Sequence, residues 1–476
     1  MLEKWGKIGY AIGYLSERVI WMQRERLGSR LGFILLSAGC AVGIGNVWKF
    51  PYIAGQNGGG IFVLIYLFFL VILGIPVMTM EFSMGRASQK SPVLMYQPLE
   101  KPGYKWHLHG YAALAGNTIV LMCYTCITGW MLRYFVDSAG GAFVGLDAQG
   151  IGARFPEMLS NAGSMTVYTL AVVIMAAVVC SFSLQKGLER ITKWMMLSLL
   201  VLLMVLAVYS CTLEGAGEGL RFYLLPSWHT FLEVGPVKVI VAAMNQAFFT
   251  LSLGIGAMAI FGSYLEKERS LLGEAINVGL LDTCVAFTAG LIIFPACSAF
   301  GVEAGSGPSL VFATLPNIFN QLPGGRIWGS LFFVFMSFAA LSTVFAVFEN
   351  IVACLRDLLG WGRRKTCFVT CLALMVLSMP CVLGFNVLSF IQPFGEGSTI
   401  MDLEDFLANN LLLPLGSLVV VLFCTQKFGW GWDRFLAEAN AGKGRKLPQA
   451  LRFYLTWILP LIIAFVFVIG IYNFFA

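Results

Sequence analysis

Long apolar runs dominate the chain and predict helices that cross a membrane. The hydrocarbon core of a bilayer is about 30 Å thick, so a spanning helix needs about 20 mainly apolar residues. Runs of this length occur near residues 31–54, 59–85, 108–137, 164–184, 189–212, 236–264, 273–300, 326–359, 366–385, 399–424 and 450–475. We therefore predict an all-α polytopic membrane protein with about 11 transmembrane helices, preceded by a segment of residues 1–30.

The first span is interrupted where it should be most regular. Ser37–Tyr52 reads SAGCAVGIGNVWKFPY and places Gly43, Gly45 and Asn46 near the middle of the membrane. A spanning helix normally satisfies every backbone polar group internally, because hydrocarbon offers no other partner. Close helix packing would also explain glycines here. Beside an asparagine, however, they predict an unwound stretch whose free carbonyls and amides hold an ion or a small zwitterion.

The sixth span repeats this anomaly. Asn245–Gly256 mixes amides, hydroxyls and glycines, and its Gly254-Ile255-Gly256 echoes Gly43-Ile44-Gly45. Matching interruptions in two halves of a chain indicate a transport site. We therefore predict one transporter domain, residues 31–476, with broken helices 1 and 6. It consists of an inverted repeat of spans 1–5 (about 31–212) and 6–10 (about 236–424), plus a peripheral span 11 (about 450–475).

Other spans carry isolated polar groups that need a partner or a function. An aspartate at the centre of a spanning helix, such as Asp282, costs about 2.5–3.5 kcal/mol on insertion scales. Tyr124 lies near the middle of the third span. The hydroxyls of Ser342 and Thr343 either bond to their own helix or ligate a cation. We expect Glu81, near the end of the second span, to be structural and to bond to the unwound part of the first span.

Composition and charge support this class and predict an orientation. Hydrophobic residues make up 58% of the chain and charged residues 12%, with a mean hydropathy of +0.80. Of the 31 Lys and Arg residues, 25 fall in the N-terminal segment and in alternate loops. The positive-inside rule then places the N-terminus in the cytoplasm and the C-terminus outside.

Residues 1–30 lack the continuous apolar stretch of a signal peptide. Pro295–Pro323 reads as an external excursion with a short helix near Leu310–Gln321.

The twelve cysteines do not indicate a metal or redox site at this stage. Cys123 and Cys126 form a CxxC pair, but a metal site needs imidazoles or further thiolates nearby. The three histidines, His107, His109 and His229, lie outside the middle of any span. We interpret the cysteines as small, polarizable packing residues.

Several stretches together are specific to one family. The chain resembles the neurotransmitter:sodium symporter family, bacterial amino-acid branch, from about Ser29 to its end. The resemblance rests on SRLGFILLSAG with AVGIGNVWKFPY, the QNGGG turn, MEFSMGR, FFTLSLGIGA, the Asp282-Thr283 pair and the ALST of span eight. The absence of a twelfth span matches the eleven-span bacterial members.

The resemblance implies two sodium sites and no organic cofactor. The first site would use the Ala41 carbonyl, Asn46, Thr250 and Asp282, and the substrate carboxylate would complete it. The second would use the carbonyls of Gly39, Val42 and Ala339 and the hydroxyls of Ser342 and Thr343. A substrate that is also a sodium ligand couples the two binding events energetically.

The resemblance also implies an amino-acid substrate. Family members that transport monoamines have an aspartate at the position of Gly43, so glycine here implies a substrate that brings its own carboxylate. That carboxylate would bind the amides of Ile44 and Gly45 and the Tyr124 hydroxyl. The mostly apolar remainder implies a neutral, hydrophobic amino acid. The substrate residues would be Cys40, Ala41, Gly43, Ile44, Gly45, Val120, Tyr124, Phe249, Thr250, Ser252, Ile255, Thr343 and Val347.

Two gates follow from the same resemblance. Outside, Phe249 and Tyr124 would close over the substrate, with Lys49 paired to Asp405 above them. Lysine replaces the usual arginine. Its ammonium is a point charge, whereas an arginine guanidinium can bind a carboxylate through two parallel hydrogen bonds. Inside, Arg24 would pair with Asp357, close to Tyr264.

Chloride dependence is not expected. Animal members bind chloride through residues that correspond to Tyr66, Gln246 and Ser252, but Ala286 replaces a serine of that site. Asp282 would supply the negative charge that chloride otherwise provides.

The leading hypothesis is therefore a sodium-coupled symporter that imports a neutral, hydrophobic amino acid by alternating access. Its alternatives are a proton-coupled transporter of the same fold, with Asp282 or Glu81 as the proton carrier, and a channel or non-transporting amino-acid sensor. An enzyme is not expected, because no nucleophile stands beside a base and no phosphate loop occurs. The expected partners are a small-molecule amino acid and the lipid bilayer of a bacterial inner membrane. Nucleic acid is not expected, and a homodimer is left open.

Overall fold

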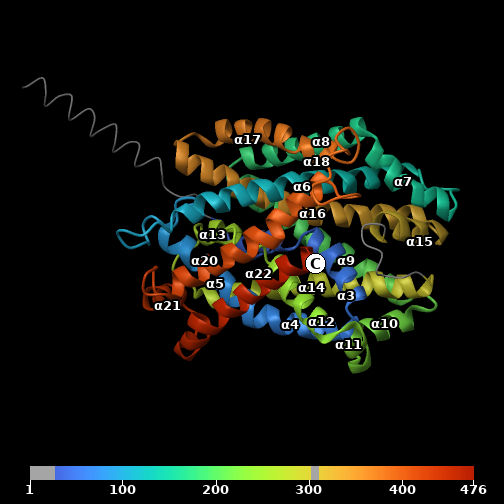
Figure 1. The fold of residues 1–476 in the computed structure, drawn as a ribbon. Helices are drawn as coiled ribbons and strands as arrows, with labels where there is room; N and C mark the ends of the chain where they lie inside the picture. The colour runs from blue at the N-terminus through green and yellow to red at the C-terminus, as the bar shows by residue number, and fades with distance from the viewer. Residues whose placement is uncertain (1–26, 302–309, 476) are drawn as a thin grey trace, which may run out of the picture.

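The computed structural model describes residues 27–301 and 310–475, and these are helical almost throughout (Figure 1). The first half contains α2 (Arg30–Ala41), the π-helix η1 (Gly45–Lys49), α3 (Phe50–Gln56), α4 (Gly60–Phe69), η2 (Leu70–Gly74), α5 (Ile75–Ser88), α6 (Leu108–Gly140), α7 (Ala148–Ser160), α8 (Ala162–Ser181), η3 (Gln185–Glu189), α9 (Arg190–Cys211), α10 (Ala216–Leu224) and α11 (Trp228–Val234).

The second half begins with a helix that starts at a proline. It contains α12 (Pro236–Thr250), α13 (Ala257–Gly262), α14 (Leu271–Ala299), η4 (Leu310–Thr314), α15 (Leu315–Gln321), α16 (Gly325–Leu359), α17 (Arg363–Leu377), α18 (Met379–Leu383), α19 (Ile400–Phe406), η5 (Leu407–Leu412), α20 (Leu413–Thr425), α21 (Trp432–Ala439), η6 (Gln449–Leu451), η7 (Tyr454–Ile458) and α22 (Leu459–Phe475). The short helix expected near Leu310–Gln321 is present as η4 and α15.

The described residues contain nine helices long and apolar enough to span a membrane, or up to eleven if each of two bent pairs is one span. This confirms the prediction of an all-α polytopic membrane protein. The first bent pair is the predicted broken span, in which Arg30–Ala41 and Gly45–Gln56 meet at 59°. The second pair joins Trp228–Val234 to Pro236–Thr250 at 94°. It lies ahead of the predicted break in span six, which is a separate interruption within that span.

The first break requires glycine because other residues approach the backbone closely. Helix α2 ends at Ala41, and Val42 is extended, with φ −70° and ψ 99°. A Cβ atom on Gly43 would lie 2.7 Å from the Thr343 hydroxyl oxygen, and one on Gly45 would lie 2.4 Å from a Phe249 ring carbon. Both positions therefore exclude a side chain while the neighbours stay in place.

The break in span six is a six-residue turn between α12 and α13. Ser252, Gly254 and Gly256 have positive φ angles of 51°, 96° and 69°. The Glu81 carboxylate accepts hydrogen bonds from the backbone N–H groups of Gly254, at 2.6 Å, and Met258, at 3.0 Å. It thereby satisfies amides that a helix start leaves without partners.

Glu81 therefore corrects one prediction. The expectation that it bonds to the unwound part of the first span was wrong, because its partners lie in the sixth. The carboxylate binds the N–H groups of Gly254, in the turn, and of Met258, in the first turn of α13, which have no helical acceptor.

Two long helices, α6 and α16, run side by side across the molecule (Figure 1) and pack against each other. Helix α16 also contacts α2, α8 and α9, while α14 contacts α2, η1 and α9. The broken helices are thus enclosed by continuous ones. Helix α22 packs on α20 and α12. Figure 1 places α7, α10, α11 and α15 toward one end of the bundle (the α7 end) and α21 at the opposite end (the α21 end).

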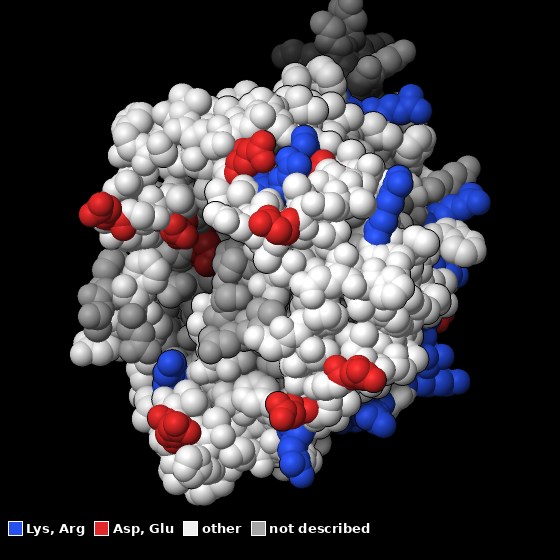
Figure 2. Space-filling model, turned by 90° about the vertical axis from the view of Figure 1, so that its right-hand side faces the viewer, with Lys and Arg blue, Asp and Glu red and all other residues white. Residues whose placement is uncertain are grey.

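The surface at the α7 end is mostly uncharged. Figure 2 shows this end, with Asp and Glu side chains scattered over it and several Lys and Arg side chains along one edge of the view. The N-terminal segment proposed for residues 1–30 lies mainly outside the described residues, which begin at residue 27.

Candidate functional site

Three polar side chains from different helices meet at the first break. The Asn46 amide nitrogen lies 2.8 Å from a carboxylate oxygen of Asp282 and 3.1 Å from the hydroxyl oxygen of Thr250. The Thr250 hydroxyl in turn donates to the other carboxylate oxygen of Asp282 at 2.9 Å. All three residues are buried, with at most 1% of each exposed. We refer to them as the first oxygen cluster.

The first oxygen cluster can offer a cation several hard oxygen atoms. Ala41 is the last residue of α2, so its carbonyl lies in the turn where helical hydrogen bonding stops. The Asn46 side-chain oxygen accepts from the Gly43 N–H at 3.1 Å. A half-turn of the carboxamide exchanges its nitrogen and oxygen, whose assignment in structures follows from the hydrogen-bond network. The oxygen would then face Thr250 and Asp282.

A second oxygen cluster forms between α2 and α16. The Thr343 hydroxyl oxygen lies 3.3 Å from the Gly39 carbonyl oxygen, 3.2 Å from that of Val42 and 3.5 Å from that of Ala339. The Ser342 hydroxyl lies 2.9 Å from the Ala339 carbonyl and 3.5 Å from that of Val42. All five separations exceed the 2.7–2.8 Å usual for a hydroxyl hydrogen bond. Five oxygen atoms converge here, and oxygen is the ligand that hard cations prefer.

A cavity of about 480 Å³ lies beside the second oxygen cluster, and we refer to it as the central cavity. Among the described residues, its charged lining groups are Lys49, Asp402 and Asp405. The predicted substrate residues that line it are Ile44, Gly45, Val120, Tyr124, Phe249, Ser252, Ile255, Thr343 and Val347. The remaining predicted substrate residues, Cys40, Ala41, Gly43 and Thr250, are buried in the two breaks next to it.

Lys49 and Phe249 stand together at the mouth of the central cavity. The Lys49 ammonium lies 4.1 Å from the centre of the Phe249 ring and 3.9 Å from a carboxylate oxygen of Asp405. The side chains of Lys49 and Asp405 are 35% and 55% exposed, so water weakens this ion pair. Asp405 also accepts a hydrogen bond from Asn409 at 2.5 Å. The structure thus brings together the residues predicted for the outer gate.

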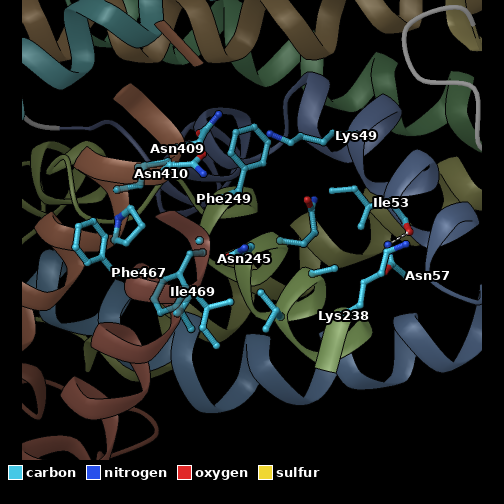
Figure 3. A pocket seen from close by; sticks show the side chains of 18 of the residues that line it. Lys49, Ile53, Asn57, Lys238, Asn245, Phe249, Asn409, Asn410, Phe467 and Ile469 are labelled. Atoms are coloured by element: carbon cyan, nitrogen blue, oxygen red, sulfur yellow. Dashed lines mark hydrogen bonds between the residues drawn. The ribbon is translucent and has the colours of Figure 1, made fainter. Parts of the chain in front are cut away.

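Phe249 also lines a second cavity, of about 960 Å³ (Figure 3). It shares Lys49, Phe249, Asn409 and Leu413 with the central cavity. Lys238 of α12 and Phe467 of α22 also line it. Gln246, which lines it too, is 1% exposed, and neither polar atom of its side chain has a hydrogen-bond partner within the described chain. Sequence reasoning did not anticipate this cavity.

The predicted inner gate is described only in part. Arg24 lies outside the described residues. The Tyr264 hydroxyl donates to Glu349 at 3.1 Å, and Glu349 is paired with Arg363 at 2.5 Å. Asp357 accepts from the Ser91 N–H at 2.7 Å.

Sequence reasoning missed the Glu349–Arg363 pair near this gate. Glu349 lies inside an apolar helix, whereas Arg363 is the first of three consecutive basic residues, and the fold joins the two across the turn between α16 and α17. The Glu349 and Arg363 side chains are only 1% and 10% exposed. A glutamate inside an apolar helix was the available signal, because such a residue needs a partner.

Comparison with known proteins assigns the family. The family model described as "Sodium:neurotransmitter symporter family" matches residues 24–144 and 150–476. An uncharacterized sodium-dependent transporter of Bacillus subtilis is 37% identical over 458 residues, covering 94% of this chain and 98% of the relative. An uncharacterized sodium-dependent transporter of Haemophilus influenzae is 30% identical over 463 residues, with 94% and 99% covered.

A solved structure agrees with the sequence matches. The crystal structure of MhsT in complex with L-phenylalanine has a TM-score of 0.84 and 38% sequence identity, and the match covers 94% of this chain and 99% of that one. Together with the family model, this likeness confirms the resemblance seen in the sequence. The chain belongs to the sodium:neurotransmitter symporter family, a family of membrane transporters that use sodium.

Proposed function

We propose that the protein is a sodium-coupled symporter that imports a neutral, hydrophobic amino acid by alternating access. The observation that carries this proposal is the contact between the central cavity and the second oxygen cluster. Thr343 belongs to both, since it lines the cavity and its hydroxyl faces the carbonyls of α2. A ligand in the cavity and a cation in the cluster would therefore share one side chain.

We assign two sodium ions to the two oxygen clusters. Asp282 is the anion of the first cluster, and a cation between it, Asn46 and Thr250 would offset the cost of burying its charge. The carboxylate of the substrate would complete this shell. Each sodium then raises the affinity for the substrate, and the substrate raises the affinity for sodium by the same factor.

The geometry beside Gly43 supports a substrate that carries its own carboxylate. A Cβ atom on Gly43 would meet the Thr343 hydroxyl at 2.7 Å and the Tyr124 hydroxyl at 3.4 Å. This position therefore has no room for the acidic side chain that a monoamine would need. The N–H groups of Ile44 and Gly45 begin the helical segment after the break, where the helix dipole favours an anion.

The rest of the central cavity favours an apolar side chain. Val120, Ile255 and Val347 line it, and its charged residues stand at the mouth. The structure of MhsT in complex with L-phenylalanine shows that a related protein with this fold binds a hydrophobic amino acid. We therefore assign a neutral, hydrophobic amino acid as the substrate.

We further propose that the α7 end of the molecule faces outward.

We also propose that transport does not require chloride. Ala286 is fully buried where animal members have a serine, so one chloride ligand is absent, and Asp282 supplies a fixed negative charge nearby. Uptake into proteoliposomes should be unchanged when gluconate replaces chloride. A collapse of uptake would reject this part of the proposal.

Thermal stability of the purified protein tests the substrate and its coupling. A ligand that binds only the folded state stabilises it by about 2.7 kcal/mol at a hundredfold excess over Kd. All twenty amino acids should be screened in sodium and again in potassium. We expect one or more apolar amino acids to raise Tm in sodium alone. An equal rise in both salts that varies with pH would favour proton coupling, and no rise with any amino acid would reject the substrate class.

A further inference from the structure

A cluster of thiols and a carboxylate lies beside the gate and has no place in sodium-coupled transport. Cys123 of α6, Cys381 of α18 and Glu404 of α19 bring their ligand atoms within 4.8 Å of one another. The Cys123 thiol donates a hydrogen bond to a Glu404 carboxylate oxygen at 3.0 Å. Exposed fractions are 6% for Cys123, 0% for Cys381 and 5% for Glu404. We refer to these three residues as the thiol cluster.

Glu404 is a buried acid without a cationic partner. Within the described chain it forms no salt bridge, whereas its neighbour Asp405 pairs with Lys49. A buried carboxylate inside a membrane segment is costly unless it is neutralised or paired. Two thiols offer only weak hydrogen bonds, so the cluster contains an unbalanced acid together with two soft ligands.

We propose that the thiol cluster binds a thiophilic divalent cation of the zinc class. Zinc prefers tetrahedral sites of thiolate, imidazole and carboxylate ligands. With Zn–S bonds of about 2.3 Å, ligand atoms in such a site are about 3.8 Å apart. The cluster therefore needs only small side-chain shifts. Binding would release the thiol protons, since thiolates are the ligands.

A further thiol and a route of entry lie next to the cluster. Cys126 lies one turn along α6 from Cys123, on the same side of that helix, and is buried. Cys123 lines the central cavity with Asp402 and Asp405, so an ion can reach it through the mouth of that cavity. The CxxC pair thus obtains the further ligands that its sequence lacks.

The position of the thiol cluster links the metal to the gate. Cys123 precedes the substrate residue Tyr124, and Glu404 precedes the gate residue Asp405. A metal ion would join α6 to α18 and α19 and so restrict any movement of α19 during gating. We therefore expect the ion to inhibit transport reversibly. This inhibitory role rests on the proposed function, whereas metal binding itself does not.

Cadmium binding to the purified full-length protein tests the site, because cadmium thiolates absorb in the ultraviolet. We expect saturation at one equivalent, with zinc competing. Cys381→Ser and Glu404→Gln, both nearly isosteric, should weaken binding by at least about tenfold, the lower end of losses seen even for outer-shell partners. The matched control Cys284→Ser changes an exposed cysteine of α14 and should leave binding unchanged.

Three outcomes would overturn the proposal. These are an absence of saturable absorption, binding that survives in Cys381→Ser, and a disulfide between the cluster cysteines in the purified protein. Zinc should also lower sodium-driven uptake in the native chain and not in Cys381→Ser, and a chelator should restore it. Because the cadmium titration uses neither sodium nor an amino acid, its failure would leave the transport proposal standing.

Discussion

At the scale of single residues, the site depends on oxygen atoms held at distances that suit a cation. Thr343 faces four backbone carbonyls at 3.2–3.5 Å, beyond the usual range of a hydroxyl hydrogen bond. Asn46 and Thr250 hold the Asp282 carboxylate from two sides. The sequence motifs indicated these residues, because polar groups are conspicuous within apolar helices. The distances follow only from the fold.

Removing one ligand from either oxygen cluster should weaken sodium binding. A hydrogen bond to a charged group contributes about 1.5–3 kcal/mol, and we take the contact of an oxygen ligand with sodium to be of similar size. Thr343→Ala and Asn46→Ala should therefore each raise the sodium concentration for half-maximal binding by about tenfold or more. Sodium-dependent thermal stabilisation measures this directly.

A matched control for these variants is Thr288→Ala. Thr288 is half-buried, and within the described part of the chain its hydroxyl donates to the Cys284 carbonyl of its own helix. Its removal should leave sodium dependence unchanged. If both ligand variants also keep the native sodium dependence, the assignment of the two clusters is wrong.

A single methyl group at Gly43 should damage the site without unfolding the protein. In Gly43→Ala the new Cβ would lie 2.7 Å from the Thr343 hydroxyl oxygen, so the hydroxyl must move away from the second oxygen cluster. We expect weaker binding of both sodium and the amino acid, read from ligand-dependent shifts in Tm. Gly140→Ala is the control, because no heavy atom lies within 4 Å of its added Cβ. Native affinities in Gly43→Ala would contradict the assigned pocket.

At the scale of the helical elements, the sequence predicted where the helices are interrupted. The contacts that stabilise these interruptions could be seen only in the fold. Glycines within apolar runs located both interruptions. The partner of Glu81 could not be found this way, because 173 residues separate it from Gly254. Nor could the thiol cluster, whose members come from α6, α18 and α19 and become neighbours only on folding.

Loss of the Glu81 carboxylate should destabilise the start of α13. Glu81→Ala leaves two buried N–H groups without acceptors, and each such group costs about 1–3 kcal/mol. We expect a clear fall in Tm for Glu81→Ala and a smaller fall for Glu81→Gln, which keeps one acceptor. Glu157→Ala, at an exposed site of α7, serves as the control and should not change Tm. Equal Tm values for Glu81→Ala and the native protein would show that this cap is not needed.

At the scale of the whole molecule, the number of spans could be predicted from the sequence, whereas the second cavity could not. The apolar runs predicted about 11 spans, and the described residues contain nine helices that could span a membrane, or up to eleven if each bent pair is one span. The length of apolar segments is set by the bilayer, which explains this agreement. The second cavity, which Phe249 lines, has no comparable signature, because its lining comes from η1, α3, α12, η5, α20 and α22.

The proposed orientation can be checked by cysteine labelling in intact cells. Glu157 of α7 and Arg434 of α21 are both exposed and lie on helices at opposite ends of the bundle. A membrane-impermeant thiol reagent should label Glu157→Cys from outside and Arg434→Cys only after permeabilisation. The native chain, whose cysteines are mostly buried, gives the background. The reverse pattern would invert the topology.

The bond between Glu81 and the sixth span also has a consequence for biosynthesis. The carboxylate belongs to the first half of the chain, and the amides that receive it belong to the second. At about 5–20 residues per second, the ribosome needs about 9–35 s to extend the chain by the 173 residues from Glu81 to Gly254. During that interval the acid has entered the membrane segment without its native partners. The first half therefore cannot form the native hydrogen bonds of Glu81 until the second half has been synthesised. We expect a fragment that ends before residue 254 not to reach the native fold by itself.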